Sequence, residues 1–341
     1  MKHANIAIFV PHVGCPNRCS FCDQRRITGV QAPPDGGAVR AACEQALQQM
    51  GEERARNAEV AFFGGSFTAI PREYMIELLE AARPFVWEHA FHGIRISTRP
   101  DAIDPEVLGL LRVYGVTAIE LGAQSMDDEV LRLNRRGHTA RDVENASRMI
   151  RAGGFSLGHQ MMFGLYGDTA EKTIATARRL AALKPDTMRV YPTVVLKNTM
   201  LAELYEQGRY RPLTVPEAVR MSAWLLNYFE THGVSVIRLG LHASRELEEN
   251  MIAGGYHAAL GELCANELFR QRILRELEQC NPPLGKLVVE VAPGRVSQAV
   301  GQRRSNALML EQRGYQPKFC PNRSLTGYQC RFRWPLSKQR K

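Results

Sequence analysis

Seven short apolar runs, separated by stretches with helical periodicity, constrain the fold of this 341-residue chain more than any other feature. The runs are rich in Val, Ile, Phe and Leu and end near Gly, Ser or Thr, as buried strands do. They span residues 5–10, 59–65, 93–98, 117–124, 155–165, 187–193 and 234–241. Helical patterns occupy residues 37–55, 72–89, 104–115, 140–153, 169–183 and 214–233. This alternation predicts an α/β fold in which helices cover parallel strands.

Polar and glycine-rich segments lie at the downstream ends of several predicted strands. A cysteine-rich loop follows the first strand, "GGSFT" follows the second, "STRPD" the third and "GLYGDT" the fifth, and "ELGAQS" lies at the fourth. In a parallel barrel these ends converge on the face that carries the active site. The pattern therefore favours a partial (βα)6 TIM-like barrel over a doubly wound sheet.

The loop after the first strand, "FVPHVGCPNRCSFCDQ", contains Cys15, Cys19 and Cys22 in a C-x3-C-x2-C spacing. Structural zinc normally takes four protein ligands, and no second C-x2-C pair or histidine-rich segment completes such a set. Three thiolates fit a [4Fe-4S] cluster better, because each cysteine binds one iron and the fourth iron stays open to a small molecule. The motif predicts an iron–sulfur site with one open coordination position.

The spacing, with Phe21 before the last cysteine, resembles the signature of radical S-adenosylmethionine (SAM) enzymes. Further segments are similar to the radical domain of the catalytic subunit of the Elongator complex, and that domain is itself similar to oxygen-independent coproporphyrinogen oxidase. These segments are "FFGGSFTAIP", "RISTRPDAID", "IELGAQSMDDEVLRLNRRGHT", "MMFGLYGDT" and "RVYPTVVLKNT", and the resemblance covers approximately residues 6–241. It implies a [4Fe-4S] cluster on Cys15, Cys19 and Cys22 whose fourth iron binds SAM, and reductive cleavage of SAM to a 5′-deoxyadenosyl radical.

The resemblance also implies roles for residues at the other strand ends. Gly64 and Gly65 would let the backbone approach the methionine ammonium of SAM, with Ser66 as an acceptor. Arg99 would pair with the methionine carboxylate. The remaining positions at which members of the family bind polar groups of the cofactor or the substrate are Ser97, Thr98, Glu120 and Gln124.

Two of these assignments have alternatives in the residues themselves. Glu120 is equally well explained by neutralising Arg99 or another basic residue in the barrel mouth. Gly164, on the strand implied to back the adenine, would permit close approach, although apolar neighbours there are also expected from core packing.

Charge divides the chain into two parts. Residues 281–341 contain 12 Lys and Arg against Glu290 and Glu311, a balance of +10, whereas the whole chain carries +9. We expect a radical SAM domain over residues 1–241 and a small basic α+β extension over residues 242–341. An anionic partner, RNA above all, is expected for this extension. Its segment "YQCRFRW" predicts a half-buried strand with aromatic residues inside and arginines outside.

The loop that cradles acetyl-CoA in the Elongator subunit has no counterpart after residue 241, so carboxymethyl transfer is not implied. The leading hypothesis is a radical SAM enzyme that modifies RNA such as tRNA. The alternatives are a radical SAM enzyme for a small anionic metabolite such as a tetrapyrrole, and a non-catalytic iron–sulfur RNA-binding protein. Residues 1–12 show no signal sequence and no apolar stretch is long enough to span a bilayer, which predicts a cytoplasmic protein with no membrane association. An electron donor such as flavodoxin or ferredoxin would reduce the cluster.

Overall fold

The computed structural model describes residues 4–11, 15, 19–23, 32–88 and 91–334. It contains two compact units. The first consists of Met1–Leu213 and Phe229–Gly255, and the second of Thr214–Tyr228 and Tyr256–Lys341. Helix α10 (Val215–Thr231) contributes residues to both. Within the described part of the chain, no helix is long and apolar enough to cross a membrane.

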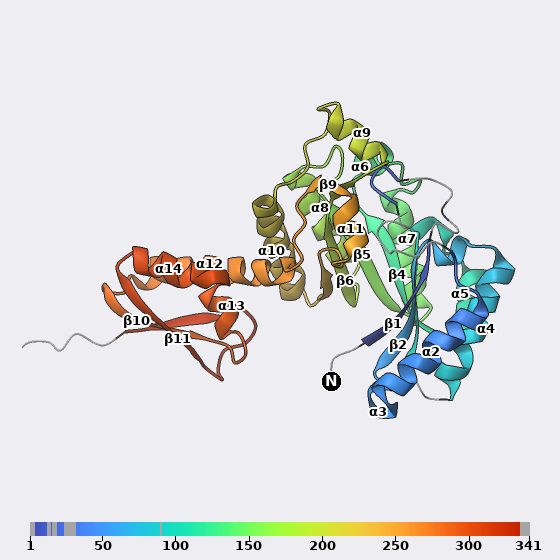
Figure 1. Cartoon of the computed structure of the whole chain (residues 1–341), viewed down its shortest axis with the longest axis horizontal. Coiled ribbons are helices and arrows are strands. Elements are labelled where there is room, and N and C mark those ends of the chain that lie inside the picture. Colours follow the sequence, from blue (N-terminus) through green and yellow to red (C-terminus); the bar gives the residue numbers. More distant parts are fainter. Residues whose placement is uncertain (1–3, 12–14, 16–18, 24–31, 89–90, 335–341) are drawn as a thin grey trace, which may run out of the picture. The chain divides into compact units, whose positions relative to one another are not determined.

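A seven-stranded parallel sheet forms the centre of the first unit (Figure 1). Neighbouring strands pair in the order β1-β2-β3-β4-β5-β6-β8, so successive strands add to one growing edge. This is the curled, open sheet of a partial TIM-like barrel, and it confirms the predicted α/β fold. The strands are β1 (Ala4–Val10), β2 (Ala58–Gly64), β3 (Gly93–Thr98), β4 (Val116–Gln124), β5 (Ser156–Phe163), β6 (Thr187–Pro192) and β8 (Ser235–Leu239).

Helices connect these strands and cover the sheet. Asp104 caps α5 by accepting from the backbone N–H of Val107, as the Asp-Pro pair at that helix start predicts. Thr139 and Asp142 form a reciprocal capping box at the start of α7. The helices of this unit are α2 (Gly36–Met50), α3 (Glu52–Ala55), α4 (Arg72–Trp87), α5 (Pro105–Val113), α6 (Asp128–Leu133), α7 (Ala140–Ala152), α8 (Ala170–Ala182), α9 (Met200–Glu206) and α11 (Arg245–Asn250), with the short antiparallel pair β7 (Val194–Leu196) and β9 (Met251–Gly254).

The main hydrophobic core lies between the sheet and these helices. Ile94 and Ile96 of β3 pack with Leu78 of α4 and Leu111 of α5, and all four are fully buried. Side chains alternate between the two faces of a strand. Because the apolar ones fill the layer between the sheet and the helices, the polar ones of the same strands point to the opposite face of the sheet.

His159 of β5 is buried without a charged partner, so the stability of the fold should depend on pH. Its Nε2 lies 2.8 Å from the hydroxyl of Ser147, and burial lowers the pKa of the imidazole to about 3. Because this pKa is below the value of about 6.5 in the unfolded chain, the neutral ring stabilises the fold fully above pH 6.5, and that stability is lost as the pH falls towards 3. At pH 5.5 the free energy of unfolding should be lower by about 1 kcal/mol. Denaturant unfolding at pH 7.5 and 5.5 should show this difference in the free energy of unfolding of the native protein, and a smaller difference in His159→Gln. An equal pH dependence in the two proteins would contradict the role of His159.

The second unit packs helices on one face of a three-stranded sheet. Strand β10 (Gly285–Val291) is central, parallel to β11 (Tyr315–Pro321) and antiparallel to β12 (Cys330–Arg333). Phe269 and Ile273 of α12, Val289, Leu310 and Phe332 belong to its core. The predicted alternation in "YQCRFRW" is confirmed, since Phe332 is buried while Arg331 and Arg333 are exposed. The helical elements are α12 (Leu260–Cys280), α13 (Val296–Val300), the 3-10 turn η3 (Gln302–Arg304) and α14 (Ser305–Gln312).

The cysteines outside the N-terminal motif are free thiols. Cys43 in α2 and Cys264 in α12 are buried, as expected for small apolar residues in helices. Cys280 also lies in a helical pattern but is exposed, because it is the last residue of α12.

Candidate functional site: a cavity at the strand ends

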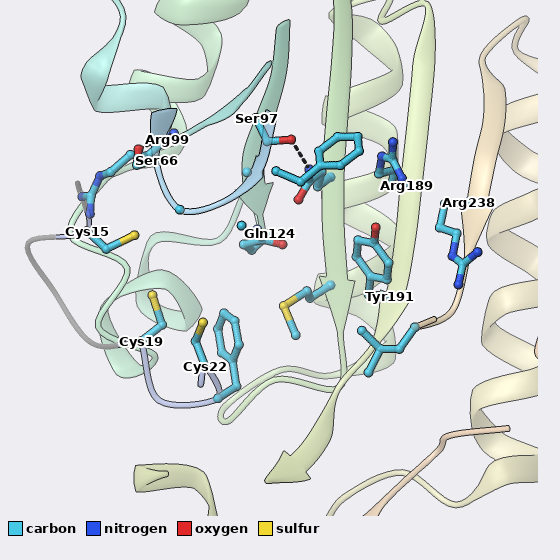
Figure 2. Close-up of a pocket in the computed structure, with 18 of the residues that line it drawn as sticks. Cys15, Cys19, Cys22, Ser66, Ser97, Arg99, Gln124, Arg189, Tyr191 and Arg238 are labelled. Atoms are coloured by element: carbon cyan, nitrogen blue, oxygen red, sulfur yellow. Dashed lines mark hydrogen bonds between the residues drawn. The ribbon is translucent and has the colours of Figure 1, made fainter. Parts of the chain in front are cut away.

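A cavity of about 480 Å³ lies at the carboxyl ends of the parallel strands in the first unit. Figure 2 shows Cys15, Cys19 and Cys22 on one side of it, with Arg189 and Arg238 on the opposite side. The parallel topology explains this arrangement, since every strand end of the sheet faces the same rim. Residues distant in the sequence therefore share one site.

The segment with Cys19 and Cys22 is fixed to the barrel by hydrogen bonds from Ser20. Its hydroxyl donates to Oδ1 of Asn134 over 2.6 Å, and its backbone N–H donates to the carbonyl of Asn134 over 3.1 Å. The carbonyl of Ser20 accepts from the N–H of Leu201 over 2.8 Å, and the N–H of Cys22 donates to the carbonyl of Cys19 over 3.2 Å. These bonds hold the two thiols at the cavity wall.

The surroundings favour an anionic sulfur at Cys19 and keep Cys15 and Cys22 protonated. Nη1 of Arg136 lies 3.1 Å from Sγ of Cys19, so it can donate to a thiolate there. Burial raises the pKa of Cys22, and the neighbouring Cys19 and Cys15 raise it further. Burial and Cys19 likewise raise the pKa of Cys15. Binding of a metal at these thiols would therefore release protons.

The three thiols do not form a site for a single metal ion. In the described ranges, no group of three His, Cys, Asp or Glu side chains could hold one ion. A [4Fe-4S] cluster has a different requirement, because each cysteine ligates a different iron and the sulfurs stand apart. Three free cysteines lining one cavity fit that donor set.

The glycine-rich segment after β2 forms a backbone cradle beside Cys15. Gly64 has φ +106°, and a Cβ there would lie 3.3 Å from the carbonyl oxygen of Val10. The N–H of Gly65 donates to that same carbonyl over 2.8 Å. The buried hydroxyl of Ser66 accepts from the N–H of Arg99 over 3.0 Å. The structure thus requires glycine at position 64, and Gly64, Gly65 and Ser66 all line the cavity.

Ser97 and Arg99, at the end of β3, also line the cavity. The hydroxyl of Ser97 accepts from Nε2 of Gln160 over 3.2 Å. The guanidinium of Arg99 makes a bidentate contact with Asp101, at 2.6 and 2.7 Å. The Nε–Nη2 edge of Arg99 is therefore already paired with a carboxylate of this chain, whereas the resemblance assigns Arg99 to the methionine carboxylate of SAM.

Glu120 lies behind the cavity lining and forms a buried ion-pair network. Its carboxylate accepts from Nε and Nη2 of Arg189 over 2.6 and 3.0 Å and from Nη1 of Arg95 over 3.2 Å. Gln160 donates to it over 3.1 Å. This is the neutralising arrangement that the sequence left open, with Arg95 and Arg189 as the partners. Burial lowers the pKa of Arg189, but the carboxylate of Glu120 and Tyr191 raise it overall.

Gln124 ends β4 in an unusual conformation. Its φ is +62°, in the left-handed region, and the β4–β5 register shifts between Gly122 and Gln124. Its buried Oε1 has no hydrogen-bond partner among the described residues, although the side chain lines the cavity. A buried acceptor without a partner, on a strained residue, is typical of a ligand site.

Gly164 is not among the residues that line the cavity. It has φ +73°, and a Cβ there would lie 2.6 Å from Cδ1 of Leu213. Its N–H donates to Asp168 over 2.8 Å, and its carbonyl accepts from the hydroxyl of Tyr210 over 2.6 Å. The turn and the contact with Leu213 already require glycine at this position.

Two family models match the chain. The radical SAM superfamily model matches residues 9–180, half of the chain, and includes the three cysteines and most of the cavity. A Radical_SAM C-terminal domain model matches residues 185–270. The chain belongs to the radical SAM superfamily.

Relatives of this radical SAM chain include longer proteins. A protein named tRNA uridine(34) acetyltransferase from Dehalococcoides mccartyi is 28% identical over 240 residues, which cover 61% of this chain and 52% of that protein. Human Elongator complex protein 3 is 28% identical over 251 residues, covering 65% of this chain and 45% of that protein. The chain thus spans about half the length of these relatives. The structure of Elp3 from the archaeon Methanocaldococcus infernus, with an N-terminal deletion, aligns with a TM-score of 0.58 at 21% identity, covering 82% of this chain and 63% of that one.

The radical SAM cavity also contains charged and polar side chains that the sequence analysis did not predict to line it. They are Arg136, Arg189 and Arg238, together with Tyr191, whose pKa burial raises. A signal was present in "TMRVYP", where an arginine and a tyrosine alternate with the buried Met188 and Val190. A polar residue at alternate positions of a central strand indicates a strand with one face on a polar cavity.

Proposed function

We propose that this radical SAM enzyme binds a [4Fe-4S] cluster through Cys15, Cys19 and Cys22, binds SAM in the adjoining cavity and modifies RNA, with tRNA as the leading substrate. The observation that supports it best is that the three thiols line one cavity at the carboxyl ends of a parallel half-barrel. When bound, the cluster supplies the electron that cleaves the sulfonium C–S bond of SAM to give methionine and a 5′-deoxyadenosyl radical.

The residues of the chain would bind, orient and shield the reactants. Arg136 places positive charge beside Cys19, which would stabilise the anionic cluster. Gly64 and Gly65 line the cavity and carry no side chain, so the methionine end of SAM would approach the backbone there. Gln124 offers the acceptor that no described residue satisfies. Part of the cavity is lined by the apolar side chains of Met162, Val194 and Leu196, which would exclude water from the 5′-deoxyadenosyl radical.

Gln124 provides a test of the SAM site that does not depend on turnover. Because its Oε1 lacks a partner within the protein, Gln124→Ala should lower the free energy of unfolding by no more than about 1 kcal/mol. Loss of one hydrogen bond to the ligand should weaken SAM binding about tenfold, measured by anaerobic equilibrium dialysis on cluster-loaded protein. The exposed Gln207→Ala is the matched control. An unchanged dissociation constant would remove Gln124 from the binding site.

RNA is proposed as substrate on two grounds. The relatives include proteins named for acetyl transfer to tRNA uridine 34, and residues 281–341 carry the balance of +10. Acetyl transfer itself is not proposed, because residues 242–341 contain no acetyl-CoA loop. We propose a cytoplasmic setting and a reducing partner such as flavodoxin or ferredoxin.

A small anionic metabolite is the second candidate. Arg238 supports it, since its guanidinium lines the cavity and its one hydrogen bond in the described structure runs from Nε to the carbonyl of Gly240 over 3.0 Å. A tetrapyrrole carboxylate would suit such a group. Saturable, salt-insensitive binding of a porphyrin would favour this candidate over RNA.

Anaerobic reconstitution tests the proposed chemistry. The chain should take up about four iron and four sulfide ions, and addition of SAM and a strong reductant should yield 5′-deoxyadenosine. A loaded protein that never cleaves SAM would rule the proposal out. Mass spectrometry of tRNA nucleosides from cells with and without the gene would then identify the modified base, and identical nucleoside profiles would speak against tRNA.

A further inference from the structure

We propose that the open face of the three-stranded sheet in the second unit binds the phosphate backbone of RNA. The inference deepens the proposed function and rests on it for the identity of the partner. The face is defined as the side chains that point away from the helices: Lys286, Val288 and Glu290 of β10, Gln316, Lys318 and Cys320 of β11, and Arg331 and Arg333 of β12.

The strand registers place these side chains together. Val288 of β10 pairs with Lys318 on one side and with Arg333 on the other. Glu290, two residues further along β10, pairs with Cys320 and Arg331. Paired residues of neighbouring strands share a face of the sheet, and strands lie about 4.8 Å apart. Lys318 and Arg333 therefore flank Val288 about 10 Å from each other, with Arg331 one row away.

Helices cover the opposite face of this sheet, whereas no described element covers the face defined above. Val289, Val291 and Phe332, which alternate with the residues above, belong to one core with side chains of α12, α13 and α14. Lys286, Lys318, Arg331 and Arg333 are all exposed. An exposed sheet face with several cations is a surface for an anionic polymer rather than for a second apolar layer.

The charge of the face is strongly positive. Four cations stand against one acid, Glu290, which gives a net charge of +3. Glu290 is itself buried, accepts from Asn322 over 2.8 Å and pairs with Arg333 over 2.5 Å. No ion pair to Lys286, Lys318 or Arg331 exists within the residues described, so these three are available to phosphates.

The chemistry of the face points to the backbone of RNA rather than its bases. The face as defined contains no aromatic side chain, whereas the aromatic residues Tyr328, Phe332 and Trp334 pack on the core. Base stacking needs exposed rings, and phosphate contacts need only cations. Binding should therefore depend steeply on salt and little on sequence.

A rival position in the same unit is the turn Gln302–Arg304 before α14, where Arg303 and Arg304 have φ +51° and +63°. Arg304 is already paired with Glu311 over 2.7 Å. The turn therefore offers fewer unpaired cations than the sheet face, and it serves as the competing location in the test.

The test measures RNA affinity of the full cluster-loaded chain, by filter binding of bulk tRNA and of a single-stranded oligouridylate across a salt series. The triple variant K286Q/K318Q/R331Q leaves the Arg333–Glu290 pair intact. If each cation contacts one phosphate, the log–log salt slope should fall by about 2, and affinity at 0.1 M salt by about 100-fold. The matched control R40Q/R54Q/R56Q removes three exposed arginines from α2, α3 and the residue that follows, and should change affinity less than threefold.

Three outcomes would overturn the assignment. Equal losses in the triple variant and its control would show a general charge effect. An unchanged triple variant, with binding lost in R303Q, would move the site to the turn and leave the proposed RNA substrate intact. A native chain that binds neither RNA would remove both the surface and the RNA substrate. SAM cleavage without RNA should be equal in all variants, which separates this surface from the radical site.

Discussion

Replacing Cys19 by alanine is expected to abolish SAM cleavage and to leave the fold in place. Cys19 lines the cavity together with Cys15 and Cys22, and Arg136 donates to its sulfur. Loss of a group that merely orients a metal ligand typically costs 10- to 100-fold, so loss of the ligand itself should lower 5′-deoxyadenosine formation by more than about 100-fold. Iron content after anaerobic reconstitution should fall in parallel.

The control for this experiment is Cys280→Ala, at an exposed cysteine in the last position of α12. It should load iron and cleave SAM as the native chain does. The circular dichroism spectrum and the RNA affinity of Cys19→Ala should match those of the native chain, because the cysteine loop contributes no residue to the main hydrophobic core. A parallel loss of fold and RNA binding would instead support the non-catalytic iron–sulfur protein.

Replacing Glu120 by glutamine should destabilise the protein strongly, because its carboxylate balances two buried guanidinium groups. The carboxylate is 1% exposed and is shared by Arg95 and Arg189, whose side chains are 7% and 14% exposed. The substitution keeps the shape but leaves two buried guanidinium groups with less compensation; Glu59 still pairs with Arg95 over 2.6 Å. Breaking such a buried network costs about 3–5 kcal/mol, which denaturant unfolding at pH 7.5 would measure.

Glu106→Gln is the matched control, since it removes a carboxylate from the exposed pair with Arg72. That change should cost about 0–1 kcal/mol. If Glu120→Gln unfolds at the same denaturant concentration as Glu106→Gln and binds SAM more weakly, the carboxylate serves the ligand and not the fold.

Local patterns were sufficient to predict most of the architecture. Each of the seven apolar runs became a strand of the parallel sheet, because continuous burial on both faces leaves a run of Val, Ile, Phe and Leu in the sequence. Asp104 before Pro105 marked a helix start for an equally local reason. The three cysteines could be recognised because they lie at a characteristic spacing within a single loop.

Side-chain partners could not be predicted in this way. Arg99 faces Asp101, two residues away, yet the motif gave equal reason to direct it to a ligand. The glycine requirement at position 164 depends on Leu213, which no pattern in the neighbouring sequence indicates.

The sequence by itself determined the order of strands and helices, the loop that carries the thiols and the superfamily, because periodicity and motif spacing are properties of neighbouring residues. Only the tertiary structure decided which charges meet. Glu120 and Arg189 are 69 positions apart and lie on β4 and β6, with β5 between them in the sheet. Their contact depends on strand order, register and the curl of the barrel, and the same geometry gathers Lys318, Arg331 and Arg333 on one exposed face.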